Sequence, residues 1–387
     1  MTQHGILDSE SGADLLQRGY NRRDLGRIAA LLGAGAVAVS AARPAWAAQT
    51  QTASAKVLID SNECWTGPME PGQAAARAII ARSNRYEPGN ERDKFIAAVV
   101  KADGVPADHV SPWPGSSDPL SRAVVTFASP QRGLVTADPT FELAWTTAEY
   151  LGVPIKKVPL TPDYRHDVKA MLAADPAAGL YYVCSPNNPT GTITPLEDIA
   201  WLVRNKPAGS KVLVDEAYIH FAGAPSAAAL FSQSQDVVVL RTFSKLFGMA
   251  GMRMGYALSH PANVAAMQRY DGDALSGSLP LPSLACATAS LGQSALIEQR
   301  RAFMEANLAF VTRQVERRGF KVIPSRANMF MVDWNGRPAK QMREAIRKQG
   351  VEIGRSWAIW PTVSRVTVSS RAEMIAFLNA LDRALKA

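Results

Sequence analysis

Residues 241–255 read Arg241-Thr-Phe-Ser-Lys245-Leu-Phe-Gly-Met-Ala-Gly-Met-Arg253-Met-Gly. They follow an apolar run at 237–240 that is typical of a buried strand. The segment places one lysine in a turn of small residues, with two hydroxyl side chains before it and an arginine eight positions after it. A lysine that forms an imine with an aldehyde needs such a setting, because its amine must be shielded from water and a phosphate must be held nearby.

Two further segments carry residue types that complete such a site. One reads Ser185-Pro-Asn-Asn188-Pro-Thr-Gly191 and the other Val214-Asp215-Glu-Ala-Tyr218. Asp215 is a candidate partner for a protonated ring nitrogen, while Tyr218 and Asn188 can both reach a ring hydroxyl. Together, the three segments predict a site for pyridoxal 5'-phosphate in which Lys245 is the Schiff-base residue.

The phosphate of this cofactor needs several hydrogen-bond donors and a cation that does not titrate. Arg253 offers a planar, permanently charged guanidinium group. The expected hydroxyl and backbone N–H donors are Thr242, Ser244, Ser116 and Ser117. The two serines at 116 and 117 stand before a helix-like segment, whose N-terminus favours anions. Phe141 is expected to stack on the pyridine ring, although an aromatic residue there could equally belong to the core.

Composition and charge exclude several other classes of function. The net charge of +8 comes from scattered Lys and Arg residues, without a basic run or an RNA-binding signature, so no nucleic-acid partner is expected. The three cysteines are widely spaced and odd in number, so they form neither a disulfide framework nor a metal site. The five histidines show no paired spacing, and no metal is expected.

From about residue 90, helical and strand-like segments alternate, which predicts an α/β fold with a largely parallel sheet. Strands are expected at 132–136, 179–184, 211–214 and 237–240, and helices at 94–102, 142–151 and 196–204. A smaller α+β domain should follow, with a helix at 294–318 and strands at 329–333 and 365–368. The expected division is an N-terminal arm at 48–85, a large cofactor-binding domain at 86–280 and a small C-terminal domain at 281–387.

The first 47 residues resemble a secretory signal. Arg22-Arg23 precedes an uncharged run at 28–42, and Ala45-Trp46-Ala47 forms an A-x-A cleavage pattern. The paired arginines predict twin-arginine export of a folded enzyme to the periplasm. The apolar run is shorter than the ~20 residues of a permanent membrane helix, so no stable span is expected. The alternative is an amphipathic or buried N-terminal helix of a cytoplasmic enzyme.

The three cofactor segments, in this order and spacing, resemble the class I/II aminotransferases of fold type I, and most closely the histidinol-phosphate aminotransferase branch. The resemblance covers residues 57–385 and implies a homodimer with shared sites. It implies that Lys245 also moves the proton between Cα and the cofactor, and that Tyr86 reaches the phosphate of the neighbouring subunit. It further implies that Arg365 holds the substrate carboxylate and that Arg355 and Asn62 lie on the substrate side.

The expected reaction is the transfer of an amino group between an amino acid or related amine and a 2-oxo acid. The arm at 61–68 and the segment at 353–361 depart from the branch pattern on the substrate side, so the sequence leaves the amino donor open. Trp357 and Trp360 suggest an apolar or aromatic donor if they line the pocket. A decarboxylase, lyase or racemase on the same scaffold, and a non-catalytic cofactor-binding protein, are the alternatives.

Overall fold

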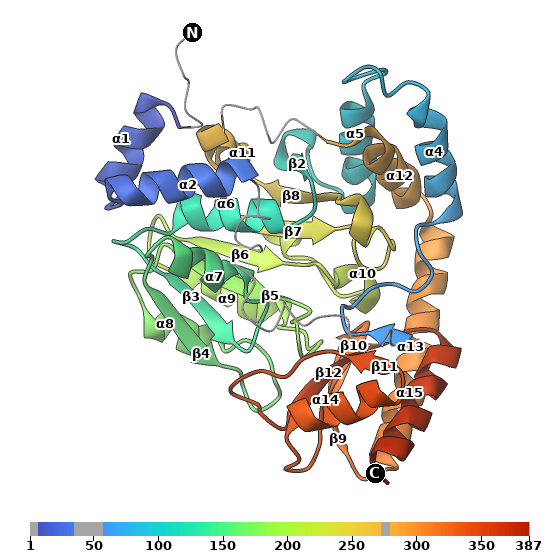
Figure 1. Cartoon of the computed structure of the whole chain (residues 1–387). Coiled ribbons are helices and arrows are strands. Elements are labelled where there is room, and N and C mark those ends of the chain that lie inside the picture. Colours follow the sequence, from blue (N-terminus) through green and yellow to red (C-terminus); the bar gives the residue numbers. More distant parts are fainter. Residues whose placement is uncertain (1–6, 35–56, 272–278, 387) are drawn as a thin grey trace.

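A seven-stranded sheet organises the larger part of the molecule (Figure 1). The computed structural model describes residues 7–34, 57–271 and 279–386. In spatial order the strands are β2 (Val110–Trp113), β8 (Gly255–Ser259), β7 (Val237–Thr242), β6 (Lys211–Asp215), β5 (Leu180–Cys184), β3 (Leu134–Asp138) and β4 (Ile155–Pro159). Six of these seven strands run in the same direction, and β8 runs opposite to them, between β2 and β7. The prediction of an α/β fold with a mostly parallel sheet is confirmed.

Alternate residues of the central strands pack against helices on opposite faces of this sheet. Every residue of β5 and β7 is buried, as expected for strands covered on both faces. One face packs against α5 (Glu91–Asp103), α8 (Val168–Ala174) and α9 (Leu196–Asn205). The other packs against α6 (Ser117–Phe127), α7 (Leu143–Tyr150) and α11 (Pro261–Gln268). The strands therefore stay apolar along their length and turn polar only where they end.

The carboxyl ends of β5, β6 and β7 lie side by side, and all three sequence motifs begin there. Cys184 pairs with Asp215, and Asp215 pairs with Leu240. Ligands of open α/β sheets bind beyond these strand ends. Parallel register alone thus brings the three motifs together.

A second, smaller part of the chain covers this edge of the large sheet (Figure 1). It contains the antiparallel sheet β12–β10–β9 and the parallel pair β1–β11. Its elements are β1 (Val57–Ile59), β9 (Lys321–Ala327), β10 (Met329–Asp333), α14 (Ala339–Lys348), β11 (Val351–Ile353), β12 (Val363–Thr367) and α15 (Arg371–Ala384). The long helix α13 (Ser294–Glu316) contacts both this part and the short helix α10 (Ile219–Ala222) of the large sheet region. Two further helices, α4 (Glu70–Ile80) and α12 (Leu281–Leu291), pack against each other beside α5.

The N-terminal segment folds onto the large sheet region as two helices, α1 (Ser9–Gln17) and α2 (Arg22–Ala34) (Figure 1). Leu15, Ile28 and Leu31 are buried in the same apolar cluster as the residues of α6 and α7. Arg22 and Arg23, the paired arginines of the expected signal, are exposed where α2 begins. This packing agrees with the buried-helix alternative for the segment. The expected cleavage pattern at 45–47 lies outside the described residues.

No helix in the described parts of the chain combines the length and the apolar character needed to cross a bilayer.

Candidate active site

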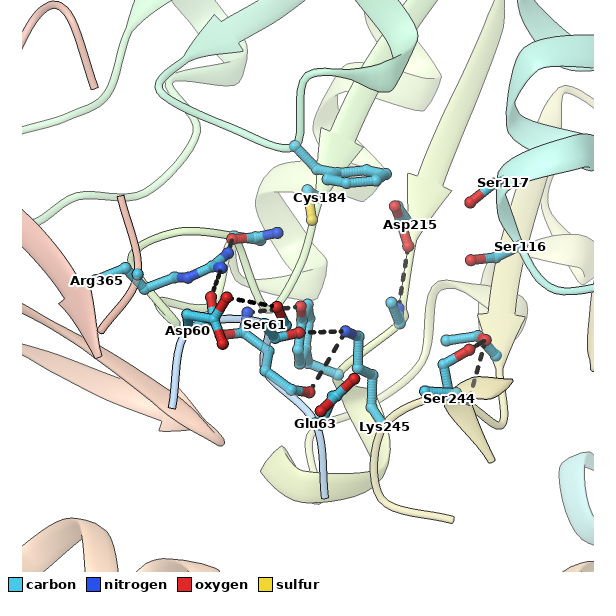
Figure 2. Close-up of a pocket in the computed structure, with 18 of the residues that line it drawn as sticks. Asp60, Ser61, Glu63, Ser116, Ser117, Cys184, Asp215, Ser244, Lys245 and Arg365 are labelled. Atoms are coloured by element: carbon cyan, nitrogen blue, oxygen red, sulfur yellow. Dashed lines mark hydrogen bonds between the residues drawn. The ribbon is translucent and has the colours of Figure 1, made fainter. Parts of the chain in front are cut away.

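The predicted site residues surround one cavity of about 410 Å³ between the large sheet and the small domain. Thirteen of the fourteen line it: Asn62, Ser116, Ser117, Phe141, Asn188, Asp215, Tyr218, Thr242, Ser244, Lys245, Arg253, Arg355 and Arg365. The exception is Tyr86, which is fully exposed between α4 and α5 and does not line this cavity. Figure 2 shows the labelled side chains converging on the cavity from both parts of the fold.

Lys245 lies at the centre of the cavity, in the turn after β7 (Figure 2). Its Nζ donates to the backbone oxygens of Ser61 and Asn62, at 3.5 and 3.4 Å. Burial and the positive charge of Arg365 lower the pKa of Lys245 to about 8. An amine with this pKa is neutral in a substantial fraction of molecules near pH 8, which is the form that attacks an aldehyde.

Asp215 ends β6 and is buried beneath the cavity. Its carboxylate accepts hydrogen bonds from the Tyr182 hydroxyl at 3.0 Å and from the backbone N–H of Ala217 at 3.1 Å. Burial nevertheless raises the pKa of Asp215 to about 6. A buried carboxyl group of this kind is stabilised in its charged form by a cation placed against it, such as a protonated pyridine nitrogen.

A cradle for a phosphate lies on the side of Lys245 that faces away from Arg365 (Figure 2). Arg253 Nη1 lies 3.3 Å from Ser244 Oγ, which also receives a hydrogen bond from Thr242 Oγ1. Ser116 and Ser117, at the start of α6, lie on the same side of the cavity (Figure 2). Gly115 adopts a φ of +91°, and a Cβ there would come within 2.6 Å of Arg253 Nη2. The tight turn thus needs glycine so that Arg253 can reach the N-terminus of α6.

The substrate side of the cavity joins distant parts of the chain. Arg365, on β12, donates to Asn188 Oδ1 at 2.8 Å and to the backbone oxygen of Asp60. Asn62 Nδ2 donates to the Tyr218 hydroxyl at 2.9 Å, and its backbone N–H donates to Thr367 Oγ1. Asn62 therefore holds the arm against both β12 and the cofactor side of the site.

Several residues that line the cavity or contact its lining were not among the predicted ones. Tyr182 and Cys184 lie on β5, and the in-register pairing of Cys184 with Asp215 places both beneath the site. Period-two alternation from Cys184 would have put Tyr182 on the same face of the sheet. Glu142 was missed because its ion pair with Arg355, at 2.6 Å, depends on tertiary structure alone. Trp357 lines the cavity, whereas Trp360 packs edge-on against Tyr164 at 5.8 Å.

This donor set fits pyridoxal phosphate. The cradle around Arg253 suits a phosphate, Asp215 suits a protonated ring nitrogen, and Lys245 suits an aldehyde. Phe141 lines the cavity and supplies an aromatic surface. None of the described residues forms a cluster of acidic, histidine or cysteine side chains that could hold a metal ion. Fold and site together define a pyridoxal-phosphate-dependent enzyme of fold type I.

Comparison with known proteins identifies the family. Residues 54–381 match the model of the family "Aminotransferase class I and II". The chain is 32% identical over 333 residues to a histidinol-phosphate aminotransferase of Symbiobacterium thermophilum, covering 85% of this chain and 90% of that one. It is 32% identical over 279 residues to an aromatic amino acid aminotransferase of Rhodococcus jostii, covering 70% and 75%.

The fold agrees with solved structures. A histidinol-phosphate aminotransferase from Sinorhizobium meliloti, in complex with pyridoxal-5'-phosphate, superimposes with a TM-score of 0.78. The identity is 24%, and the match covers 86% of this chain and 92% of that one. The chain belongs to the class I and II aminotransferases, and it is a pyridoxal-phosphate-dependent aminotransferase similar to histidinol-phosphate aminotransferases.

Proposed function

We propose that this enzyme transfers an amino group between an amino acid and a 2-oxo acid, with Lys245 moving the proton. The observation that carries the proposal is the joint placement of Lys245, Asp215 and Arg365 around one cavity. When bound, pyridoxal phosphate supplies an aldehyde that takes up the amino group and a ring that accepts the electron pair released at Cα. Lys245 Nζ would accept the proton from the substrate Cα and donate it to the aldehyde carbon of the cofactor.

Arg365 determines which bond of the substrate reacts. A guanidinium group binds a carboxylate through two parallel hydrogen bonds and so fixes its direction. Arg365 is held by Asn188 and Asp60, and its Nε has no hydrogen-bond partner among the described residues. A substrate whose carboxylate is held in this way keeps that group, which favours transamination over decarboxylation.

The test is a visible spectrum of the protein loaded with pyridoxal phosphate, recorded as single amino acids are added. We expect particular amino acids to change the absorbance of the bound cofactor and to yield one equivalent of the matching 2-oxo acid, detected by mass spectrometry. Release of carbon dioxide or loss of a side chain instead would assign the site to one of the alternative chemistries. Absorbance that no amino donor changes would overturn the proposal.

We propose further that the enzyme is a homodimer in which Tyr86 completes the site of the partner subunit. Tyr86 is fully exposed, and Leu58 and Ile80 also expose more than half of their side chains. Analytical ultracentrifugation should give a dimer, and Tyr86→Phe should weaken cofactor binding. A monomer at micromolar concentration with full activity would contradict this.

Export to the periplasm is proposed on the sequence pattern of Arg22-Arg23, the apolar run and the A-x-A site. Cell fractionation and N-terminal sequencing test it, with the double change Arg22→Lys and Arg23→Lys as the export-blocked control. A protein that stays with the cytoplasmic fraction and keeps its first 47 residues would support the buried-helix alternative.

A further inference from the structure

Four arginines line the cavity, and their charges are used in two different ways. Among the described residues, Arg253 hydrogen-bonds to the Ser244 hydroxyl and the backbone oxygen of Ala250. Arg365 likewise donates to neutral oxygens, the side-chain amide oxygen of Asn188 and the backbone oxygen of Asp60. Within the described part of the chain, neither forms an ion pair. These two cations match the two anions that the proposed reaction brings in, the cofactor phosphate and the substrate carboxylate.

The two outer arginines, in contrast, are each neutralised by a carboxylate. Arg343 on α14 pairs with Glu352 at 2.6 Å, and its Nε donates to the same carboxylate at 2.7 Å. Arg355 pairs with Glu142 at 2.6 Å. Glu142 precedes α7 in the large sheet region, and Arg355 follows β11 in the small domain, so this pair bridges the two parts of the fold. The part of the cavity lined by Arg343 and Arg355 thus carries no net positive charge from these two arginines.

An aromatic surface lies directly beside these pairs. The guanidinium carbon of Arg355 is 4.4 Å from the centre of the Trp357 ring, and Trp357 is buried. Stacking on Trp357 fixes the plane of Arg355, while Glu142 takes up its charge. Phe141, the residue before Glu142, forms another part of the wall.

We propose that Glu142 is a specificity-determining residue: by neutralising Arg355 it makes the enzyme select amino donors with uncharged side chains and reject those with carboxylate or phosphate side chains. The inference rests on the proposed transamination. An anionic side chain of the amino donor would have to displace Glu142 from Arg355 or lie beside the Glu142 carboxylate. Two like charges in contact repel each other, and this repulsion disfavours binding. An uncharged side chain would contact Trp357, Phe141 and the Glu142–Arg355 ion pair without breaking that pair.

The test compares Glu142→Gln with the unchanged enzyme, both loaded with pyridoxal phosphate. The probes are phenylalanine, glutamate and O-phosphoserine, and the measured quantity is kcat/KM for each. The unchanged enzyme should prefer phenylalanine by about tenfold or more, and Glu142→Gln should raise kcat/KM for both anionic donors by about tenfold. The ratio of kcat/KM for each anionic donor to kcat/KM for phenylalanine should rise with it, because the phenylalanine side chain does not use the charge of Arg355.

Glu149→Gln is the matched control. Glu149 lies on α7 and pairs with Lys157 at 3.5 Å, and Lys157 does not line the cavity, whereas Arg355, the partner of Glu142, does. This variant should keep the selectivity of the unchanged enzyme, and thermal melting should show that both variants are folded. A purely structural role of Glu142 would lower kcat/KM for all three donors together and would overturn the inference.

The outcomes also distinguish the specificity role of Glu142 from transamination itself. Conversion of amino donors with no preference against anionic ones, or a preference that Glu142→Gln leaves unchanged, overturns the specificity role and leaves transamination standing. Failure of every donor, while the cofactor is bound, overturns the proposed function and the inference with it.

Discussion

Lys245 is half-buried and lies near the cation of Arg365, and desolvation and this charge both lower its pKa. With a pKa of about 8, roughly a tenth of the amine is neutral at pH 7 and about nine tenths at pH 9. The rate at which the cofactor-free protein captures pyridoxal phosphate should therefore rise with pH and level off above about pH 9. Stopped-flow absorbance between pH 6 and 10 measures it.

Arg365 provides the control for this pH profile. Its charge is the second cause of the lowered pKa of Lys245, after burial. Arg365→Met should consequently move the midpoint of cofactor capture to higher pH. A rate that still rises beyond pH 10 in the unchanged protein would mean that Lys245 titrates like an ordinary lysine.

Tyr182 acts on the reaction through Asp215 and is a positioning residue. Its hydrogen bond lowers the pKa of Asp215, so Tyr182→Phe should raise that pKa above about 6. Since the carboxylate must be charged to pair with the ring nitrogen, the acidic limb of kcat should move to higher pH. A hydrogen bond to a charged group contributes about 1.5–3 kcal/mol, so kcat should fall about tenfold or more near pH 6.

The neighbouring Tyr181 gives a matched comparison for this prediction. Its hydroxyl donates to the backbone oxygen of Asp175, on the other face of the sheet. Tyr181→Phe should leave the pH profile of kcat in place. Equal profiles for both variants would show that Tyr182 has no influence on Asp215.

At the scale of elements, α1 and α2 are held by one arginine in particular. Arg18 Nη2 donates to the backbone oxygens of Val125 and Ala128 at 2.7 and 2.8 Å, and Nη1 donates to the Tyr270 hydroxyl at 2.7 Å. Arg18→Ala leaves these acceptors without their donor, and we expect it to lower the free energy of unfolding by about 1–3 kcal/mol. Chemical denaturation of the full chain measures this.

Arg23→Ala is the control, because Arg23 is exposed at the start of α2. It should change the free energy of unfolding by less than about 0.5 kcal/mol. If Arg18→Ala also has no effect, the hydrogen bonds of Arg18 do not stabilise the packing of α1 against the large sheet region.

The central elements could be predicted because their signals are local. The strands expected at 179–184 and 237–240 are apolar runs rich in β-branched or aromatic residues, and the structure confirms them as β5 and β7.

The predicted ends of other strands were less accurate. The strand expected from residue 132 begins at Leu134, because Ser129 and Arg132 pair with each other in a tight turn. The strand expected at 365–368 begins at Val363, where pairing with Asp333 extends it.

The cofactor side of the site was predictable for the same reason, since Asp215 ends β6 and Lys245 lies in the turn after β7. On the substrate side, Asn62, Arg355 and Arg365 were expected from the family resemblance and line the cavity, but the partner of Arg355 was not expected. The Glu142–Arg355 pair joins segments that approach only when the small domain folds over the sheet. The packing of Leu15 and Ile28 against α6 and α7 likewise has no signal within 1–34 alone, because an Ala-rich apolar run also suits a leader.

At the scale of the whole molecule, the site lies between the large sheet region and the smaller part of the fold. The helix α13 contacts both. This helix has 23 residues and is therefore roughly 35 Å long. Pyridoxal phosphate would contact Arg253 and Asp215 in the large part of the fold, so its removal should lower the melting temperature. A ligand present at about 100 times its Kd stabilises the folded state by about 2.7 kcal/mol.

A comparison of two aldehydes, with and without a phosphate, distinguishes binding at the phosphate cradle from general effects of an aldehyde on the melting temperature. Added pyridoxal phosphate should restore the melting temperature of the cofactor-free protein, whereas pyridoxal without its phosphate should restore little of it. Full recovery with pyridoxal alone would show that Arg253, Ser244 and the start of α6 contribute no binding energy.

The hydrogen bond from the backbone N–H of Asn62 to Thr367 Oγ1 joins residues 305 positions apart, near opposite ends of the chain. Protein synthesis proceeds from the N-terminus, so the ribosome makes Asn62, Asp215 and Lys245 long before the last strand. Until β12 emerges, the backbone N–H of Asn62 lacks its partner Thr367 and the cavity lacks Arg365. A nascent chain therefore has no complete active site, and the enzyme becomes competent only when its translation is almost finished.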